Sequence, residues 1–175
     1  QHIFESVEHT EKRKIRALVL APTRELVTQI AENFSTYAKY INIKNTTIYG
    51  GVSQKRQEEA LRKGVDVIVA TPGRLMDLME QKIISLKDVK YLVLDEADQM
   101  LDMGFVKDIR KIVSFIPKER QSMLFSATMP KEIEKLANEM LVDPVRIAIT
   151  PVTKTLDLIT QRAYHVAKKQ KPNLL

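Results

Sequence analysis

The chain has 175 residues, of which 44% are hydrophobic, so it is long enough for one α/β domain with a core of its own. It contains no cysteine and three scattered histidines, His2, His9 and His165, which excludes disulfides and thiolate chemistry and disfavours a histidine metal cluster. No apolar stretch reaches the roughly 18 residues of a membrane span, and no signal peptide is recognisable, so we expect a cytoplasmic protein without a membrane partner. The formal net charge of +6 is compatible with a polyanionic partner.

The middle of the chain alternates short apolar segments with longer segments whose apolar residues recur three and four apart. The expected strands are 16–20, 45–49, 65–70, 91–94, 122–125 and 145–149. The expected helices are 25–40, 54–63, 75–81, 106–115 and 131–141. Strands and helices that alternate in this way are typical of a parallel sheet covered by helices, so the pattern predicts an α/β fold.

The last part of the chain is more polar. Pro151 opens the segment 151–157, which we interpret as a linker. After it, we expect 158–166 to form another strand and 168–175 to begin another helix.

Several predicted strands end in turns that suit phosphate binding, because the carboxyl edge of a parallel sheet presents backbone N–H groups and helix N-termini to a ligand. Three of these turns contain the following residues: Pro22, Thr23 and Arg24; Gly50 and Gly51; and Thr71, Pro72, Gly73 and Arg74. Each helix-start turn taken alone is more often ordinary helix capping, and a glycine pair by itself is a weak signal. Their repetition along the chain favours a function on this edge.

The acidic segment 95–98 follows the apolar run 91–94 directly, so adjacent carboxylates emerge from the end of a buried strand. In nucleoside triphosphatases a strand-end aspartate holds Mg²⁺, usually through water, and a neighbouring acid polarises the attacking water. Asp95 and Glu96 fit these two roles. The alternative is that Asp95 caps a helix beginning near Ala97, with Glu96 and Asp98 at its positive end.

Two hydroxyl side chains, Ser126 and Thr128, follow the predicted strand 122–125. If that strand neighbours 91–94, the hydroxyls can form hydrogen bonds with Asp95 or Asp98. A simple helix cap before Pro130 is the alternative.

In this order, the segments 22–26, 50–51, 71–74, 95–98 and 126–128 resemble the motifs of the DEAD-box RNA helicases. The resemblance runs from about residue 16 to residue 149. It continues weakly over 161–175, which is similar to the first strand and helix of that family's second RecA-like domain. The segments 101–105 and 117–121 resemble the bacterial branch that includes the RhlE-type helicases.

The resemblance implies a RecA-like, three-layer α/β/α fold. Residues 1–150 would form the first RecA-like domain, truncated at its N-terminus, and 158–175 would begin the second domain after the linker 151–157. The second domain of the same protein would then be a partner, and the cofactors would be ATP and Mg²⁺.

The resemblance also implies roles for individual residues. Asp95 would position Mg²⁺ on ATP, Glu96 would activate the attacking water, and Asp98, Ser126 and Thr128 would link the nucleotide state to domain closure. The sugar-phosphate backbone of one RNA strand would be held by Pro22, Thr23, Arg24, Gly50, Gly51, Thr71, Pro72, Gly73 and Arg74. Such contacts grip phosphates without reading bases, and contacts with the 2′-OH favour RNA over DNA.

One expected motif is missing. A phosphate-binding loop of the form G-x-x-x-x-G-K-[ST] needs a Gly-Lys pair, and no glycine of this sequence is followed by lysine. We therefore expect the chain to begin after the loop and after the glutamine motif that recognises adenine. Residues 1–175 alone are expected not to hydrolyse ATP.

Three hypotheses follow. The first is a segment of an ATP-dependent RNA helicase. The second is a helicase fragment that binds RNA or a protein without hydrolysis, which the missing loop supports. The third is an unrelated Mg²⁺-dependent phosphohydrolase that uses Asp95 and Glu96, which would leave Arg24 and Arg74 without a shared task.

Overall fold

The computed structural model describes residues 13–148, 164–166 and 170–171. The chain divides into two compact units, Gln1–Asp143 and Pro144–Leu175. The fold described below belongs to the first unit.

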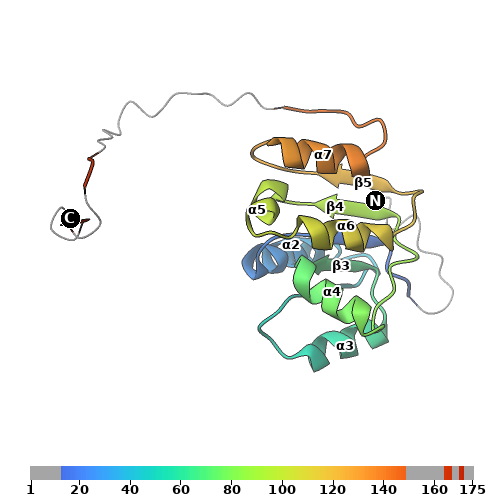
Figure 1. Cartoon of the computed structure of the whole chain (residues 1–175). Coiled ribbons are helices and arrows are strands. Elements are labelled where there is room, and N and C mark those ends of the chain that lie inside the picture. Colours follow the sequence, from blue (N-terminus) through green and yellow to red (C-terminus); the bar gives the residue numbers. More distant parts are fainter. Residues whose placement is uncertain (1–12, 149–163, 167–169, 172–175) are drawn as a thin grey trace. The chain divides into compact units, whose positions relative to one another are not determined.

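A five-stranded parallel sheet forms the centre of the first unit (Figure 1). Its strands are β1 (Ala17–Leu20), β2 (Asn45–Ile48), β3 (Val67–Ala70), β4 (Tyr91–Leu94) and β5 (Gln121–Leu124). The order is β2-β3-β1-β4-β5, and every neighbouring pair is parallel. β1 and β3 are buried along their whole length, which explains why their sequences are continuously apolar instead of alternating.

Helices cover both faces of this sheet. Their bounds are α2 (Arg24–Tyr37), α3 (Gln54–Lys63), α4 (Pro72–Glu80), α5 (Ala97–Asp102), α6 (Val106–Ser114) and α7 (Lys131–Met140). Val27 and Ala31 of α2 pack with one face of the strands, while α4, α5, α6 and α7 bury their apolar residues in a larger cluster on the other face. Alternate residues of β1 point to opposite faces of the sheet: Ala17 and Val19 pack in the cluster with α2, and Leu18 packs in the larger cluster. The result is a three-layer α/β/α fold, as predicted.

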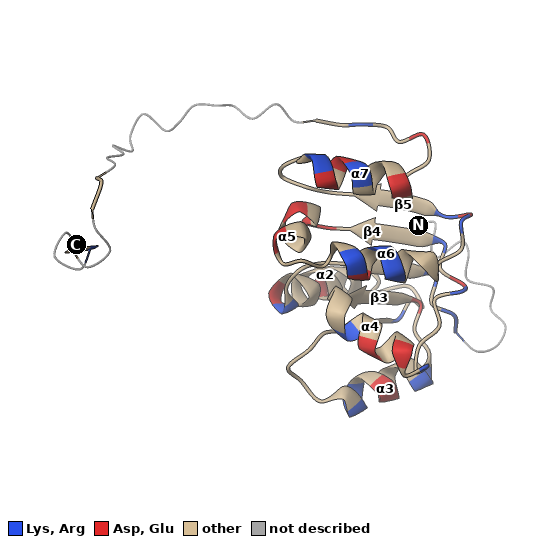
Figure 2. Ribbon diagram, in the orientation of Figure 1, with Lys and Arg blue, Asp and Glu red and all other residues tan. Residues whose placement is uncertain are grey.

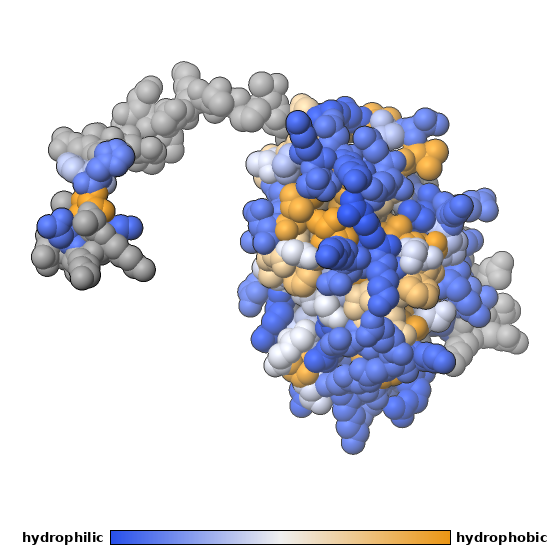
Figure 3. Space-filling view, in the orientation of Figure 1, coloured by the Kyte–Doolittle hydropathy of each residue, from blue (hydrophilic) through white to orange (hydrophobic). Residues whose placement is uncertain are grey.

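The surface over α4, α6 and α7 is mainly hydrophilic, with smaller hydrophobic areas between the helices (Figure 3). An ion pair joins two of these helices, because Arg110 Nε donates to Glu139 Oε2 at 2.7 Å.

Within the described residues, no helix has the length and apolarity that crossing a membrane requires.

Most predicted elements are confirmed within a few residues, and the differences have local causes. α2 ends at Tyr37 instead of residue 40. Ala38 is its C-cap residue, and the Ala38 N–H donates to the carbonyls of Phe34 and Thr36. α4 begins at Pro72, three residues earlier than predicted, because proline suits the first turn of a helix. The short helix α5 begins at Ala97, within the acidic segment, at the position that the capping alternative required.

The predicted strand 145–149 is wrong over residues 145–148, which form no strand; residue 149 lies outside the described residues. Val145 and Ile147 are each 87% exposed, so these apolar residues do not belong to a buried strand. The predicted linker 151–157 lies outside the described residues, as does most of the predicted strand 158–166 and helix 168–175. The described part of that strand, 164–166, has no regular secondary structure.

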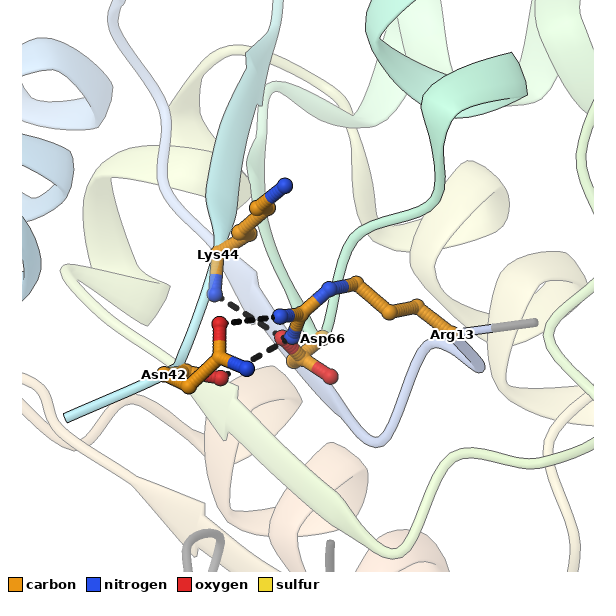
Figure 4. Close-up of polar contacts among 4 residues, drawn as sticks. All are labelled: Arg13, Asn42, Lys44 and Asp66. Carbon is orange, nitrogen blue, oxygen red and sulfur yellow. Dashed lines mark hydrogen bonds and ion pairs between the residues drawn. The ribbon is translucent and has the colours of Figure 1, made fainter. Parts of the chain in front are cut away.

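A buried aspartate ties the chain segment before β1 to the segment before β2 (Figure 4). The Asp66 side chain is only 2% exposed, and its Oδ2 atom accepts hydrogen bonds from the Arg13 guanidinium and from the Lys44 N–H at 2.8 Å. Arg13 also donates to the Asn42 carbonyl at 3.0 Å and to the Asn42 side chain. Because a buried charge is tolerated only when it is paired, this tether is expected to stabilise the start of three strands.

Candidate functional site

The turns that follow the strands begin together at the carboxyl edge of the sheet. The Asp95 N–H donates to the Leu20 carbonyl at 2.9 Å, and the Phe125 N–H donates to the Leu94 carbonyl at 2.8 Å. These bonds extend the strand ladders by one residue and hold the turns after β1, β4 and β5 in register. The sequence prediction that polar segments far apart in the chain meet on one edge is confirmed for these turns.

Asp98, Ser126 and Thr128 form a closed hydrogen-bond cluster between the turns after β4 and β5. Asp98 Oδ2 accepts from the Thr128 N–H and from the Thr128 hydroxyl, both at 2.8 Å. Ser126 Oγ accepts from the Asp98 N–H at 3.1 Å and donates to the Thr128 carbonyl at 2.7 Å. The predicted contact between the hydroxyl residues and an acid of 95–98 is therefore confirmed, and the acid is Asp98.

These bonds set the ionisation of Asp98. Partial burial raises the pKa of Asp98, but the hydrogen bonds, those from Thr128 above all, lower it more, so the pKa lies below the ordinary value of 3.8. Asp98 is thus ionised at neutral pH. Its contribution to folding stability is present above pH 3.8 and is lost as the pH falls through the lower pKa of the folded state.

Replacing Thr128 by valine should raise the pKa of Asp98 toward 3.8, because the variant lacks the hydroxyl donor. The acid-dependent stability of this region should shrink with it. A carbon-13 NMR titration of the Asp98 carboxyl measures the shift directly. Thr36→Val is the matched control, since the Thr36 hydroxyl bonds only within α2. An Asp98 pKa that is the same in both variants would contradict the assignment.

Asp95 and Glu96 lie at the end of β4 in an unusual backbone conformation. Glu96 has φ 51° and ψ 52°, a left-handed conformation that costs energy for any residue other than glycine. The Asp95 side chain accepts from the Glu96 N–H at 3.0 Å, and the residue at the N-cap position of α5 is Glu96, whose own side chain makes no cap bond. The alternative that Asp95 caps this helix is therefore wrong. The conformation leaves the Glu96 side chain exposed at the edge of the sheet.

The carboxylates at this edge fit a weakly held Mg²⁺. Among the described residues, no three His, Cys, Asp or Glu side chains converge as a ready-made metal site. Mg²⁺ usually keeps several waters and binds proteins through one or two carboxylates together with phosphate oxygens of the substrate. A half-buried Asp95 at a strand end suits that donor set.

Arg24 lies against the glycine pair that follows β2. Its guanidinium carbon is 5.4 Å from the centre of the Tyr49 ring, within the range of a cation–π contact. Gly51 has φ +78°, a left-handed conformation that favours glycine. A Cβ atom at this position would lie 2.8 Å from Arg24 Nη1, so the end of the Arg24 side chain would have to move. Gly50 has open space around it. The structure thus brings the turn after β1 and the turn after β2 together.

Sequence reasoning missed the residue that supports this contact. Gln57 of α3 is 6% exposed, and its side-chain N–H donates to the Tyr49 carbonyl at 2.9 Å. It therefore fixes the backbone beside the tyrosine on which Arg24 rests. The only available signal was a polar residue on the inward face of a predicted helix.

The turn after β3 places Arg74 in the first part of α4. The Arg74 side chain is 16% exposed; its Nε atom is 3.7 Å from Asp77 Oδ2, beyond hydrogen-bond range. Its Nε and Nη1 atoms are buried and have no hydrogen-bond partner among the described residues. A guanidinium with unused donors is suited to an anionic ligand.

The other residues of these turns have simpler surroundings. Thr23 caps α2, because its side chain accepts from the Leu26 N–H at 3.3 Å, as predicted. Thr71 precedes α4 without a side-chain cap bond, and Pro72 fills the first turn. At Gly73 an added Cβ would meet only Phe105, at an ordinary 3.9 Å, so this glycine is not required by the fold.

Comparisons with known proteins identify the family of the chain. The family model for DEAD/DEAH box helicases matches residues 1–136. The chain is 50% identical over 152 residues to DEAD-box ATP-dependent RNA helicase 40 of Oryza sativa subsp. japonica, covering 82% of this chain and 19% of the relative. It is 52% identical over 132 residues to probable ATP-dependent RNA helicase ddx17 of Dictyostelium discoideum (75% and 17%). It is 41% identical over 162 residues to DEAD-box ATP-dependent RNA helicase CshA of Streptococcus pneumoniae serotype 4 (93% and 31%). The chain thus spans less than a third of the length of these relatives.

Proposed function

Because this chain belongs to the DEAD/DEAH box helicase family, we propose that it is part of an ATP-dependent RNA helicase. In this proposal the carboxyl edge of the sheet binds the backbone of single-stranded RNA and couples ATP hydrolysis to local separation of a short duplex. The observation that carries the proposal is the meeting, on one sheet edge, of two exposed or half-buried carboxylates and an arginine with unused buried donors.

The arginines are proposed to hold RNA phosphates. Arg24 is exposed but supported by Tyr49, and Arg74 has Nε and Nη1 donors without acceptors. The N-termini of α2 and α4, at Thr23 and Thr71, add backbone N–H groups that suit the same anions. Pro22, Gly50, Gly51, Pro72 and Gly73 complete the proposed RNA-binding set. Since these groups bind phosphate and sugar, recognition would be independent of base sequence.

The carboxylates are proposed to act on ATP. Mg²⁺ bound to ATP would neutralise the charge that develops on the phosphates during transfer. Asp95 would hold that ion through water, and Glu96 would accept a proton from the attacking water. The left-handed backbone at Glu96 supports this role, because strained residues at strand ends often serve a functional purpose.

The Asp98 cluster is proposed to transmit the nucleotide state. It joins the turn that carries Asp95 and Glu96 to the turn after β5 through three hydrogen bonds between Asp98 and the residues Ser126 and Thr128. A fourth bond, from Ser126 to Thr128, holds the second turn itself. A shift of the first turn would therefore move the second. A second RecA-like domain of the same protein, reached through the linker 151–157, would be the element that closes over RNA and ATP.

The proposal is tested by ATP hydrolysis in the full-length protein with and without single-stranded RNA. We expect RNA to stimulate hydrolysis, and Arg24→Gln to raise the RNA concentration for half-maximal stimulation about tenfold, since a charge-assisted phosphate contact is lost. Lys135→Gln, the same loss of charge on an exposed position of α7, is the control. Family membership excludes the unrelated phosphohydrolase. Hydrolysis that does not depend on RNA would contradict the proposed coupling of ATP hydrolysis to RNA binding.

A second candidate is a helicase fragment that binds RNA or a protein without hydrolysis. The observation in its favour is that residues 1–175 contain no glycine followed by lysine and hence no phosphate-binding loop. We propose that these residues alone do not turn over ATP. RNA binding without hydrolysis by the full-length protein would favour this candidate.

The finer placement within the family is also a proposal. A bacterial, RhlE-like assignment rests on the segments 101–105 and 117–121. A cytoplasmic location stays an expectation from the sequence.

A further inference from the structure

The amino edge of the sheet, opposite the candidate site, carries a row of charged residues. Each strand is preceded by one of them, in the sheet order Lys44, Asp66, Arg16, Lys90 and Arg120. Backbone bonds of 2.8 Å join the first four directly, from Asp66 to Lys44, from Arg16 to Asp66 and from Lys90 to Arg16. Neighbouring strands are about 4.8 Å apart, so the row concentrates positive charge along one edge. Figure 2 shows Lys and Arg at the side where the strands begin.

Two members of the row are already used by the fold. Asp66 forms an ion pair with Arg13, so the negative charge of Asp66 is neutralised within the fold. Arg120 donates to Ser122 Oγ at 3.0 Å and to the Pro117 carbonyl at 2.8 Å, and burial lowers its pKa. The exposed cations nearest to β1 and β4 are Lys14, Lys87 and Lys90.

Those cations surround a cavity of about 340 Å³. It is lined by Lys14, Arg16, Lys87, Asp88, Val89, Lys90, Pro117 and Glu119. Lys14 is 3.8 Å from Asp88, a loose ion pair, and its side chain is 63% exposed. Lys87 and Lys90 are exposed and have no ion pair or side-chain hydrogen bond within the described residues. The cavity thus offers cationic groups in excess of its two carboxylates.

We propose that this amino-edge basic surface, Lys14, Lys87 and Lys90, is a second binding site for the sugar-phosphate backbone of RNA. The inference rests on the proposed function, because it assumes that the protein engages RNA. A row of cations along a sheet edge suits a linear polyanion better than a single phosphate, and lysine contacts of this kind carry no base specificity. The surface would therefore hold a flanking part of a long RNA while the carboxyl edge holds the strand being processed.

The test compares the full-length wild type with the double variant Lys87→Glu/Lys90→Glu on two RNAs. A short strand of about six nucleotides can fill only one groove, whereas a strand of about 40 nucleotides can reach both edges. For the long strand we expect the Kd of the double variant at 0.15 M salt to be about tenfold higher than that of the wild type. The slope of log Kd against log salt concentration should be smaller by about 1.4, because two phosphate contacts of about 0.7 each are lost. Short-strand affinity and hydrolysis at saturating short RNA should not change.

Controls keep the outcomes separate. Lys107→Glu/Lys135→Glu makes the same charge change on exposed positions of α6 and α7. Lys87→Gln/Lys90→Gln repeats the test without adding acids and should give the same loss of slope.

Unchanged long-strand affinity and slope in both amino-edge variants would overturn the inference. So would a surface that binds poly-L-glutamate but not RNA, because an acidic polypeptide would then be its ligand. A wild type that shows no RNA-dependent hydrolysis would instead overturn the proposed function.

Discussion

Replacing Glu96 by glutamine in the full-length protein is expected to lower RNA-stimulated ATP hydrolysis by about 10²- to 10⁴-fold, the usual contribution of a positioned general base. The substitution removes the carboxylate while keeping the size of the side chain. It also leaves the left-handed backbone at position 96 with a residue of similar preference, so the fold should be unaffected. Steady-state hydrolysis at saturating RNA and ATP measures the effect on kcat.

The control for this experiment is Glu59→Gln, which makes the same change on an exposed position of α3. RNA binding in the presence of ATP should persist in Glu96→Gln, because the residue is not among the proposed phosphate contacts. A loss of less than tenfold in kcat would show that another group activates the water. Loss of RNA binding together with hydrolysis would indicate a structural role for Glu96 instead.

Replacing Asp66 by asparagine is expected to destabilise the amino ends of β1, β2 and β3 by about 3 kcal/mol, since breaking a buried ion pair on one side leaves the other charge unpaired. The Asp66 side chain is 2% exposed and that of Arg13 is 18% exposed, so little water can replace the lost partner. Amide hydrogen exchange of the full-length protein, read on peptides that cover these strands, should become about 100-fold faster.

Asp102→Asn, an exposed position at the end of α5, is the matched control and should leave the exchange unchanged. Arg13→Gln should produce a similar loss in the same peptides. The double variant should be less unstable than the sum of the two, because both substitutions break the same pair. Additive losses would mean that Arg13 and Asp66 act independently, contrary to the contact in Figure 4.

Much of the fold was predictable because the signal for it is local. β3 is a run of Val, Ile and Ala that is buried on both faces, and α3 was predicted with the bounds that it has. The prediction of a strand at 145–149 was wrong because strand formation also depends on contacts that are not local. Val145 and Ile147 have the composition of a strand, but a strand also needs a neighbour to satisfy its backbone, and none pairs with residues 145–148.

The candidate site was predictable as a set of residues but not as a set of contacts. The polar turns could be assigned to one edge because parallel strands end on the same side. That Asp98 rather than Asp95 binds Thr128, and that Glu96 adopts a left-handed conformation, depend on how two turns meet. Family membership rests on the order of the motifs and on the comparisons, whereas the roles of individual residues remain proposals.

By itself, the sequence determined where most strands and helices form and which residues gather at the carboxyl edge, because burial pattern and helix-start chemistry depend on neighbours in the chain. Only the tertiary structure decided the strand order β2-β3-β1-β4-β5, the support of Arg24 by Tyr49 and Gln57, and the tether at Asp66. The physical reason is that these features join residues far apart in the chain. Hydrogen bonds and ion pairs act over a few ångströms, so their partners are set by packing and leave no periodic trace in the sequence.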